Sequence, residues 1–229
     1  MNCRYIAGLW DYQLELQLLW YYFQSWRKAP VYKAPSWSWA SSPGEVRYRS
    51  GVNNIRNLRL DLFTVLSIEA ESPAEDNLSP VFEGRLRVIG KLTPVTLFRN
   101  SELSDSEEVK EDWRDYKVKI RNNLFQFSPD IQYTPGRYYS TTLKYHVQAN
   151  RRRTSVAGLV WKATGRKRGE FQRVGLFKAL YDPPFTVKEL QDLEFCLCGR
   201  GDVDEKAEIT EELYESYDKE KDVYNFSII

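Results

Sequence analysis

The sequence predicts a mainly β fold of the α+β class: an antiparallel sheet, barrel-like or sandwich, with an N-terminal amphipathic helix and a few surface helices. Three observations support this. The 229 residues include 7 Trp, 15 Tyr and 11 Phe, and aromatic side chains favour the half-buried surface of a sheet. Several segments alternate apolar and polar residues, separated by turn residues. The clearest helical spacing of apolar residues is confined to the N-terminal region.

Residues 5–24 are predicted to form the amphipathic helix. Apolar residues recur there at intervals of three and four, namely Ile6, Leu9, Trp10, Leu14, Leu18 and Tyr21. Leu16, Leu19 and Trp20 widen the apolar surface, so we expect the helix to pack on more than one side.

The segment YKAPSWSWA (32–40) is predicted to be a short strand. Pro35 excludes a helix interior, and Trp37 and Trp39 alternate with small residues, which would place both indoles on one face. A turn at Pro43-Gly44 would return Val46–Arg49 as its hairpin partner. We expect residues 1–50 to form an aromatic core in which the helix packs on this strand.

The rest of the chain predicts sheet. Strand-like stretches are, in order, Leu58–Glu69, Gly84–Leu92, Val95–Phe98, Tyr138–Val147, Ser155–Lys162, Phe171–Leu180, Leu193–Cys198 and Val223–Ile229. Residues 155–162 and 171–180 flank a glycine-rich turn and are predicted to pair as a hairpin. Residues 72–80 predict a polar loop, 100–115 an exposed acidic loop or short surface helix, and 206–221 a surface helix. We find no repeat or linker, so residues 1–229 predict a single domain.

Charge and composition exclude several classes of function. With 33 basic and 32 acidic residues, a net charge of +1 gives no general attraction for a polyanion, so we expect no specific nucleic acid partner. No apolar run reaches the length of about 18 residues that a membrane span needs, and no signal peptide is evident. Three cysteines are too few for a disulfide framework, so we expect a cytoplasmic protein.

The residues that could carry chemistry are few. His146 is the only histidine, which argues against an acyl-transfer triad and most zinc sites. Cys196 and Cys198 would share a face of a strand, but only Cys3 and His146 could complete a metal site with them. We therefore predict no catalytic, metal-binding or cofactor-binding residue, no cofactor, and a protein that is not an enzyme.

Two basic clusters are candidate contact patches for an acidic partner or anionic lipid. They are Arg151, Arg152 and Arg153, and Arg166, Lys167 and Arg168. Because they flank the same predicted strand, we expect them at its opposite ends.

The segments AGLW (7–10), LLW (18–20) and APSWSWA (34–40) together resemble the region that follows the effector module of fungal heterokaryon-incompatibility proteins. This motif comprises Gly8, Leu9, Trp10, Trp20, Pro35, Ser36, Trp37, Ser38 and Trp39. GRLRV (84–88), AGLV (157–160) and RVGLF (173–177) resemble later segments of the same family more weakly.

The resemblance implies a setting of self/non-self recognition and programmed cell death. The family's effector module, which resembles a TIR-like α/β fold, has no counterpart in this sequence, so its activity is not carried over. We expect a non-enzymatic interaction or regulatory domain that senses a protein partner or restrains an effector supplied in cis or in trans. Two alternatives stay open: a carbohydrate- or small-ligand-binding β module with Trp37 and Trp39 exposed, and a truncated fragment without independent function.

Overall fold

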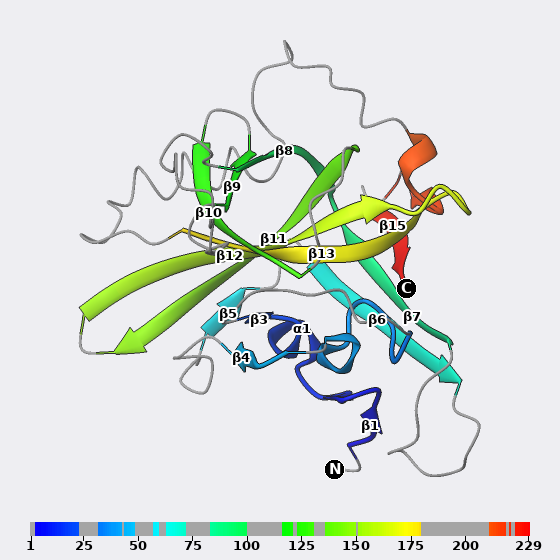
Figure 1. Ribbon diagram of the computed structural model, residues 1–229, viewed down its shortest axis with the longest axis horizontal. Helices are drawn as coiled ribbons and strands as arrows, with labels where there is room; N and C mark the ends of the chain where they lie inside the picture. The colour runs from blue at the N-terminus through cyan, green and yellow to red at the C-terminus, as the bar shows by residue number, and fades with distance from the viewer. Residues whose placement is uncertain are drawn as a thin grey trace, which may run out of the picture.

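The computed structural model describes residues 3–22, 32–42, 44–48, 57–59, 63–71, 83–99, 116–120, 123–130, 136–149, 151–179, 211–218, 220 and 223–229. In this part of the chain the fold is mainly β, which confirms the predicted fold class (Figure 1).

The first half contains β1 (Tyr5–Ile6), β2 (Leu9–Trp10), α1 (Leu14–Gln17), β3 (Trp20–Tyr22), the 3-10 turn η1 (Trp39–Ser41), β4 (Val46–Tyr48), β5 (Asn57–Arg59), β6 (Phe63–Glu71), β7 (Glu83–Gly90) and β8 (Thr93–Arg99). The second half contains β9 (Tyr116–Ile120), β10 (Asn123–Pro129), β11 (Tyr138–Ala149), β12 (Arg151–Ala163), β13 (Glu170–Ala179), the 3-10 turn η5 (Glu211–Leu213), β14 (Ser216–Asp218) and β15 (Val223–Ile228).

Six strands close into an antiparallel barrel. Its order is β8–β9–β10–β13–β12–β11, and β11 pairs with β8 to complete the ring. Alternate residues point inward and form one apolar cluster of Leu97, Tyr116, Val118, Ile120, Phe125, Phe127, Tyr138, Val160, Val174 and Phe177. A small barrel is filled by its own side chains, so this interior is a packed core.

Two glycines make room for the rings inside the barrel. A Cβ at Gly158 would lie 2.3 Å from the ring of Phe177, and a Cβ at Gly175 would lie 2.5 Å from the ring of Phe127. Both distances are shorter than any real Cβ contact, so only glycine fits at these positions. The AGLV and RVGLF segments thus supply the space that the aromatic core needs.

A second apolar cluster lies on the opposite face of β11, β12 and β13. It includes Phe63, Leu86, Val88, Tyr139, Leu159, Trp161, Phe171, Phe226 and Ile228, together with Leu9, Leu14, Leu18, Leu19 and Trp37 from the N-terminal segments. β15 pairs in parallel with β13 and antiparallel with β7, and β7 pairs with β6. In Figure 1 the long strands β11–β13 cross the centre, with β8–β10 on one side and the N-terminal elements on the other.

The predicted helix over residues 5–24 is wrong. Residues 5–10 form the hairpin β1–β2, whose turn residues Ala7 and Gly8 both have positive φ, 49° and 88°. The helix α1 is only four residues long. The apolar residues of this region belong to short separate elements that pack on the sheet. Their spacing of three and four residues arises because these elements are buried on several sides, and it does not mark one face of a helix.

The predicted strand at residues 32–40 is also wrong. The segment turns at Ser36–Trp37 and enters η1, with the backbone of Ser38 donating to Pro35. Val46–Tyr48 does form a strand, but it pairs with β3 instead. Of the four tryptophans of this region, Trp20 and Trp37 are buried, Trp39 is half-buried and Trp10 is 51% exposed.

Most of the later strands are confirmed. Leu86, Val88 and Gly90 share the buried face of β7, as predicted; β11, the β12–β13 hairpin and β15 also form where predicted. β9 and β10 were not predicted. The stretch 58–69 divides into β5 and β6, which pair with different strands. Within 206–221 the described residues form the three-residue 3-10 helix η5 and the strand β14, instead of one longer surface helix. The predictions for 72–80, 100–115 and 193–198 lie outside the described residues.

Candidate functional site

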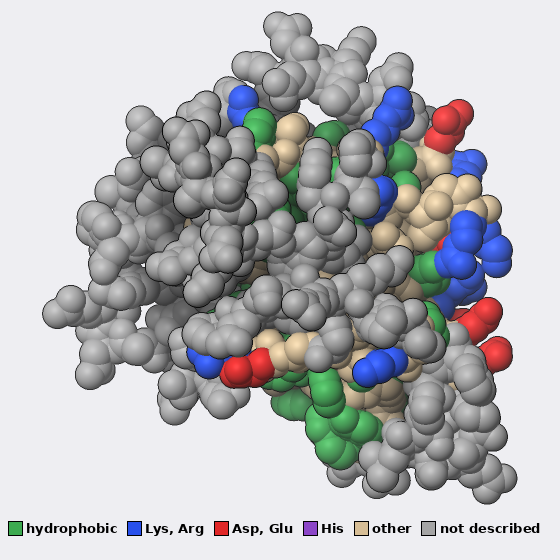
Figure 2. All heavy atoms as spheres, in the orientation of Figure 1, with side chains coloured by type: hydrophobic (Ala, Val, Ile, Leu, Met, Phe, Trp, Pro, Cys, Tyr) green, Lys and Arg blue, Asp and Glu red, His purple; other side chains and the backbone are tan. Residues whose placement is uncertain are grey.

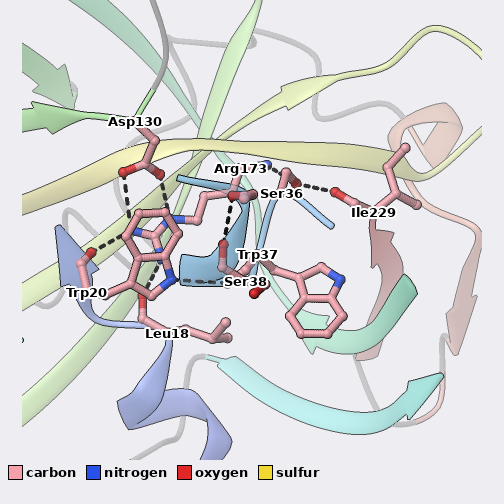
Figure 3. A network of polar contacts seen from close by, with 9 residues as sticks. Leu18, Trp20, Ser36, Trp37, Ser38, Asp130, Arg173 and Ile229 are labelled. Carbon is pink, nitrogen blue, oxygen red and sulfur yellow. Dashed lines mark hydrogen bonds and ion pairs between the residues drawn. The ribbon is translucent and has the colours of Figure 1, made fainter. Parts of the chain in front are cut away.

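Several of the residues that carry the resemblance, among them Trp20, Ser36, Trp37 and Ser38, meet in one network (Figure 3). Ser36, Trp37, Ser38 and Trp39, which we call the clasp segment, lie between the N-terminal elements, β7, β13 and the end of β15. Each of the four side chains makes a hydrogen bond to a backbone group that lies far away in the sequence. We describe these contacts in order.

Ser36 joins the last strand to the barrel. Its backbone N–H donates to the carbonyl oxygen of Ile229 over 3.1 Å, and its hydroxyl donates to the same oxygen. The hydroxyl also accepts a hydrogen bond of 3.0 Å from the backbone N–H of Arg173 in β13. One serine therefore satisfies backbone groups of two strands.

Trp37 is fully buried and packs against β7. Its indole N–H donates to the carbonyl of Gly84 over 3.4 Å, and its own carbonyl accepts from the indole of Trp20 over 3.1 Å. A Cβ at Gly84 would lie 2.2 Å from the ring of Pro35 and 3.0 Å from the ring of Trp37. Gly84 in GRLRV therefore allows Pro35 and Trp37 to pack directly against the backbone of β7.

Ser38 and Trp39 fasten the N-terminal hairpin. The hydroxyl of Ser38 donates to the carbonyl of Ala7, and the indole of Trp39 donates to the carbonyl of Gly8. The same hydroxyl accepts from the backbone N–H of Ala40 over 3.0 Å, which caps η1. These bonds give the carbonyls of the β1–β2 turn hydrogen-bond donors.

Arg173 is the charged centre of the network and is 1% exposed. Its guanidinium donates to the carboxylate of Asp130 over 2.7 Å and to the carbonyls of Leu18 and Trp20 over 2.6 and 2.5 Å. It also lies 3.5 Å from the centre of the Trp20 ring. The planar fork of arginine suits such simultaneous contacts, which lysine could not reproduce.

Asp130 is the counter-ion of Arg173. Burial raises the pKa of Asp130 to about 6, although the charge and hydrogen bonds of Arg173 act in the opposite direction. Its carboxylate faces the guanidinium and its backbone N–H donates to the carbonyl of Val174 over 2.8 Å. This arrangement holds the segment after β10, the strand β13 and the N-terminal segment together.

Sequence reasoning identified the clasp segment but missed its two charged partners. Arg173 belongs to RVGLF, where an arginine stands among apolar residues of a strand. A charge in such a run is a signal for a buried ion pair, since an unpaired buried charge is too costly. Nothing in the local sequence connects it to Asp130, which lies 43 positions away.

Several aromatic side chains of the N-terminal elements face solvent. Tyr5, Trp10, Tyr12 and Tyr48 form what we call the N-terminal aromatic surface; Trp10, Tyr12 and Tyr48 are 51%, 52% and 44% exposed. Tyr5 packs edge-on against Trp10, with 5.1 Å between the ring centres. Figure 2 shows hydrophobic side chains gathered at the end of the molecule where the N-terminal elements lie in Figure 1.

Gln17 holds this surface in place. Its side-chain oxygen accepts from the backbone N–H of Trp10 over 2.8 Å, and its amide nitrogen donates to the carbonyls of Trp10 and Tyr12 over 2.7 and 2.5 Å. The neighbouring Gln13 has a φ of 49°, an unusual value for a residue other than glycine. The exposed rings are therefore carried on a fixed backbone.

The two basic clusters lie at opposite ends of β12. Arg151, Arg152 and Arg153 are the first residues of the strand, and their side chains lie outside the described part of the structure. Arg166, Lys167 and Arg168 form the β12–β13 turn, where Lys and Arg side chains cluster in Figure 2. There Arg166 pairs with Glu170 over 3.1 Å and Arg168 donates to the carbonyl of Tyr214 over 2.7 Å.

The residues considered for metal binding do not come together in the described part of the chain. Cys3 is exposed, Cys196 and Cys198 lie outside the described residues, and His146 sits in β11 opposite Thr154, with its side chain not described. No group of three His, Cys, Asp or Glu residues among those described could hold a metal. Nor is any described helix long and apolar enough to cross a membrane.

Comparisons with protein-family models, with curated proteins and with solved structures found no match.

Proposed function

We propose that this chain is a non-enzymatic interaction domain of a heterokaryon-incompatibility-like system, which senses a protein partner or restrains an effector in self/non-self recognition. The observation that carries the proposal is the N-terminal aromatic surface. Trp10 and Tyr12 are about half exposed, yet Gln17 fixes the backbone of both. Aromatic side chains held in place before binding are typical anchors of protein interfaces, because little entropy is lost when a partner covers them.

The clasp contacts support the resemblance behind this proposal. AGLW, LLW, APSWSWA, GRLRV and RVGLF are far apart in the sequence, but each contributes a group to the same network. Their joint occurrence therefore has a structural reason. Most of these family-like residues are buried, whereas Trp10 is 51% exposed and belongs to the surface proposed to bind a partner.

The ligand-binding alternative required Trp37 and Trp39 on an exposed face. Trp37 is 0% exposed, and the indole N–H of Trp39 is bonded to Gly8. A sugar that stacks on these two rings would have to displace the N-terminal hairpin, so this form of the alternative loses its support.

The test compares the wild-type chain with a Trp10→Ala/Tyr12→Ala variant as bait in extracts of a filamentous fungus. We expect a protein that the wild type retains and the variant loses, and that binds directly once both are purified. Leu66→Ala removes a comparably exposed apolar side chain (54%) from β6 and is the matched control. If both variants retain the same proteins as the wild type, the N-terminal aromatic surface is not the binding site and the proposal fails.

A further inference from the structure

The outward face of strands β8, β9 and β10 carries a second surface. Since Leu97, Val118 and Phe125 point into the barrel, their neighbours in sequence point outward. These are Thr96, Phe98, Lys117, Lys119, Leu124 and Gln126, which we call the outer barrel face. Phe98 and Leu124 are 45% and 56% exposed, the highest values among the large apolar residues of the barrel strands whose side chains the structure describes.

The strand register arranges these residues in two rows. Phe98, Lys117 and Gln126 lie opposite one another in the first row, and Thr96, Lys119 and Leu124 in the second. Each row thus has a lysine on the central strand β9 and an apolar side chain on one flank. Phe98 and Leu124 stand at diagonal corners of this surface.

The charge of the outer barrel face is of one sign. Lys117 donates to the side-chain oxygen of Gln126 over 2.6 Å. Because Gln126 is neutral, this hydrogen bond does not neutralise the positive charge of Lys117. Lys119 is exposed and has no ion-pair partner among the described residues. The described residues of β8, β9 and β10 include no Asp or Glu.

We propose that the outer barrel face binds an acidic, amphipathic segment of a protein partner. Carboxylates of the segment would meet Lys117 and Lys119, and its apolar side chains would cover Phe98 and Leu124. Charge complementarity of this kind directs partner choice, while the apolar contacts supply affinity. Single-stranded nucleic acid fits less well, because Leu124 offers no ring on which a base can stack.

The spacing of the two apolar residues describes the ligand further. Across the sheet, Phe98 on β8 and Leu124 on β10 are separated by two inter-strand spacings, about 9.6 Å. Along the strands they are offset by two residues, about 6.8 Å, so the diagonal distance between the two positions is roughly 12 Å. Apolar residues seven or eight positions apart on a helix span about the same distance. We therefore infer an acidic helix with leucines two turns apart and glutamates between them.

This proposal rests on the proposed function only in naming a protein partner, and it concerns a different surface. The probe is a fluorescein-labelled synthetic helix with that pattern of leucine and glutamate, titrated with the folded chain and followed by fluorescence anisotropy. We expect Lys117→Glu/Lys119→Glu, and separately Phe98→Ser/Leu124→Ser, to weaken binding at least about tenfold, a change of about 1.4 kcal/mol. Near-UV circular dichroism checks that each variant keeps the native fold.

Two controls separate the outcomes. Lys167→Glu changes an exposed lysine on the β12–β13 turn and should leave binding of the probe unchanged, as should Trp10→Ala/Tyr12→Ala. The proposal for the outer barrel face is overturned if Lys167→Glu weakens probe binding as much as Lys117→Glu/Lys119→Glu does, or if the wild type does not bind the probe. Either result leaves the separate proposal for the N-terminal aromatic surface unaffected. Tighter, Lys117- and Lys119-dependent binding of a single-stranded RNA or of phosphatidylserine vesicles would also overturn it, and would assign the face to that ligand.

Discussion

A single buried arginine connects most of the segments that the sequence places far apart. The guanidinium of Arg173 contacts Asp130, two carbonyls of the N-terminal segment and the ring of Trp20. Removing one partner of a buried ion pair is far more destabilising than the net value of the pair, because the other charge is left without compensation. The same contacts fix the position of the chain between α1 and β3 against the barrel.

The pH dependence of stability tests the ion pair at Asp130. The pKa of its carboxyl rises from 3.8 to about 6 on folding, so the folded state binds this proton more tightly than the unfolded chain does. The contribution to stability is complete only at pH values below 3.8 and is lost as the pH rises through about 6. Its total size is about 3 kcal/mol at 1.36 kcal/mol per pKa unit. Asp130→Asn has no such group to titrate.

We therefore expect the unfolding free energy of the wild type, relative to that of Asp130→Asn, to fall by about 2 kcal/mol between pH 4 and pH 6. Urea denaturation at several pH values measures both proteins. Parallel pH profiles for the two proteins would show that Asp130 is ionised at pH 4 in the folded state and would contradict this account.

At the scale of elements, the clasp segment depends on the close approach of Pro35 and Trp37 to β7. In Gly84→Ala the new methyl group would meet the Pro35 ring at 2.2 Å, so the segment must move away from the strand. Overpacking of this kind costs typically 1–3 kcal/mol, and we expect a loss of about 2 kcal/mol in chemical denaturation. Gly136→Ala is the control, because its Cβ meets only the flexible end of Lys162 and should change stability by less than about 0.5 kcal/mol.

The edge strand β6 is protected by α1. The carboxylate of Glu15 accepts a hydrogen bond of 2.9 Å from the backbone N–H of Val65, and a register shift between Val65 and Ser67 interrupts the β6–β7 pairing beside it. Bulges and capped backbone groups discourage edge-to-edge association of sheets.

Glu15→Ala leaves the Val65 N–H without this acceptor, so we expect a loss of about 1–3 kcal/mol and greater association on heating. Thermal scans with light scattering follow both effects. Glu15→Gln keeps an acceptor oxygen and should lie nearer to the wild type. Equal behaviour of the wild type and Glu15→Ala would mean that the bond does not protect the edge.

At the scale of the whole molecule, the two apolar clusters share strands β11, β12 and β13. The clasp segment then ties the N-terminal hairpin and β15 to the same strands. We expect residues 1–229 to unfold in one cooperative transition, with a blue-shifted tryptophan emission from the buried Trp20, Trp37 and Trp161. Near-UV circular dichroism and fluorescence should give the same midpoint. A broad transition with red-shifted emission would favour the alternative of a fragment without independent function.

Local patterns predicted the strands that have one buried and one exposed face, or that flank a clear turn. β7 shows its alternation in Leu86 and Val88, and the β12–β13 hairpin is marked by Gly165 and Gly169. β9 was missed although it alternates, since its five residues YKVKI follow an acidic stretch and include two lysines. The candidate site was recognised only through the clasp segment, because Arg173 and Asp130 acquire their roles by meeting in space.

The amino-acid sequence was sufficient to predict the fold class and the position of most long strands, because alternation and aromatic content follow directly from residue identity. The burial of Trp37 was left open and became clear in the folded chain. The hairpin, the single helical turn and the strand β3 within residues 5–22, and the turn of the clasp segment, could not be predicted from local patterns and are seen only in the folded chain. The reason is physical. These segments are short, and their conformation is set by hydrogen bonds to Ala7, Gly8, Gly84 and Ile229 and by packing on the sheet, which no local propensity encodes.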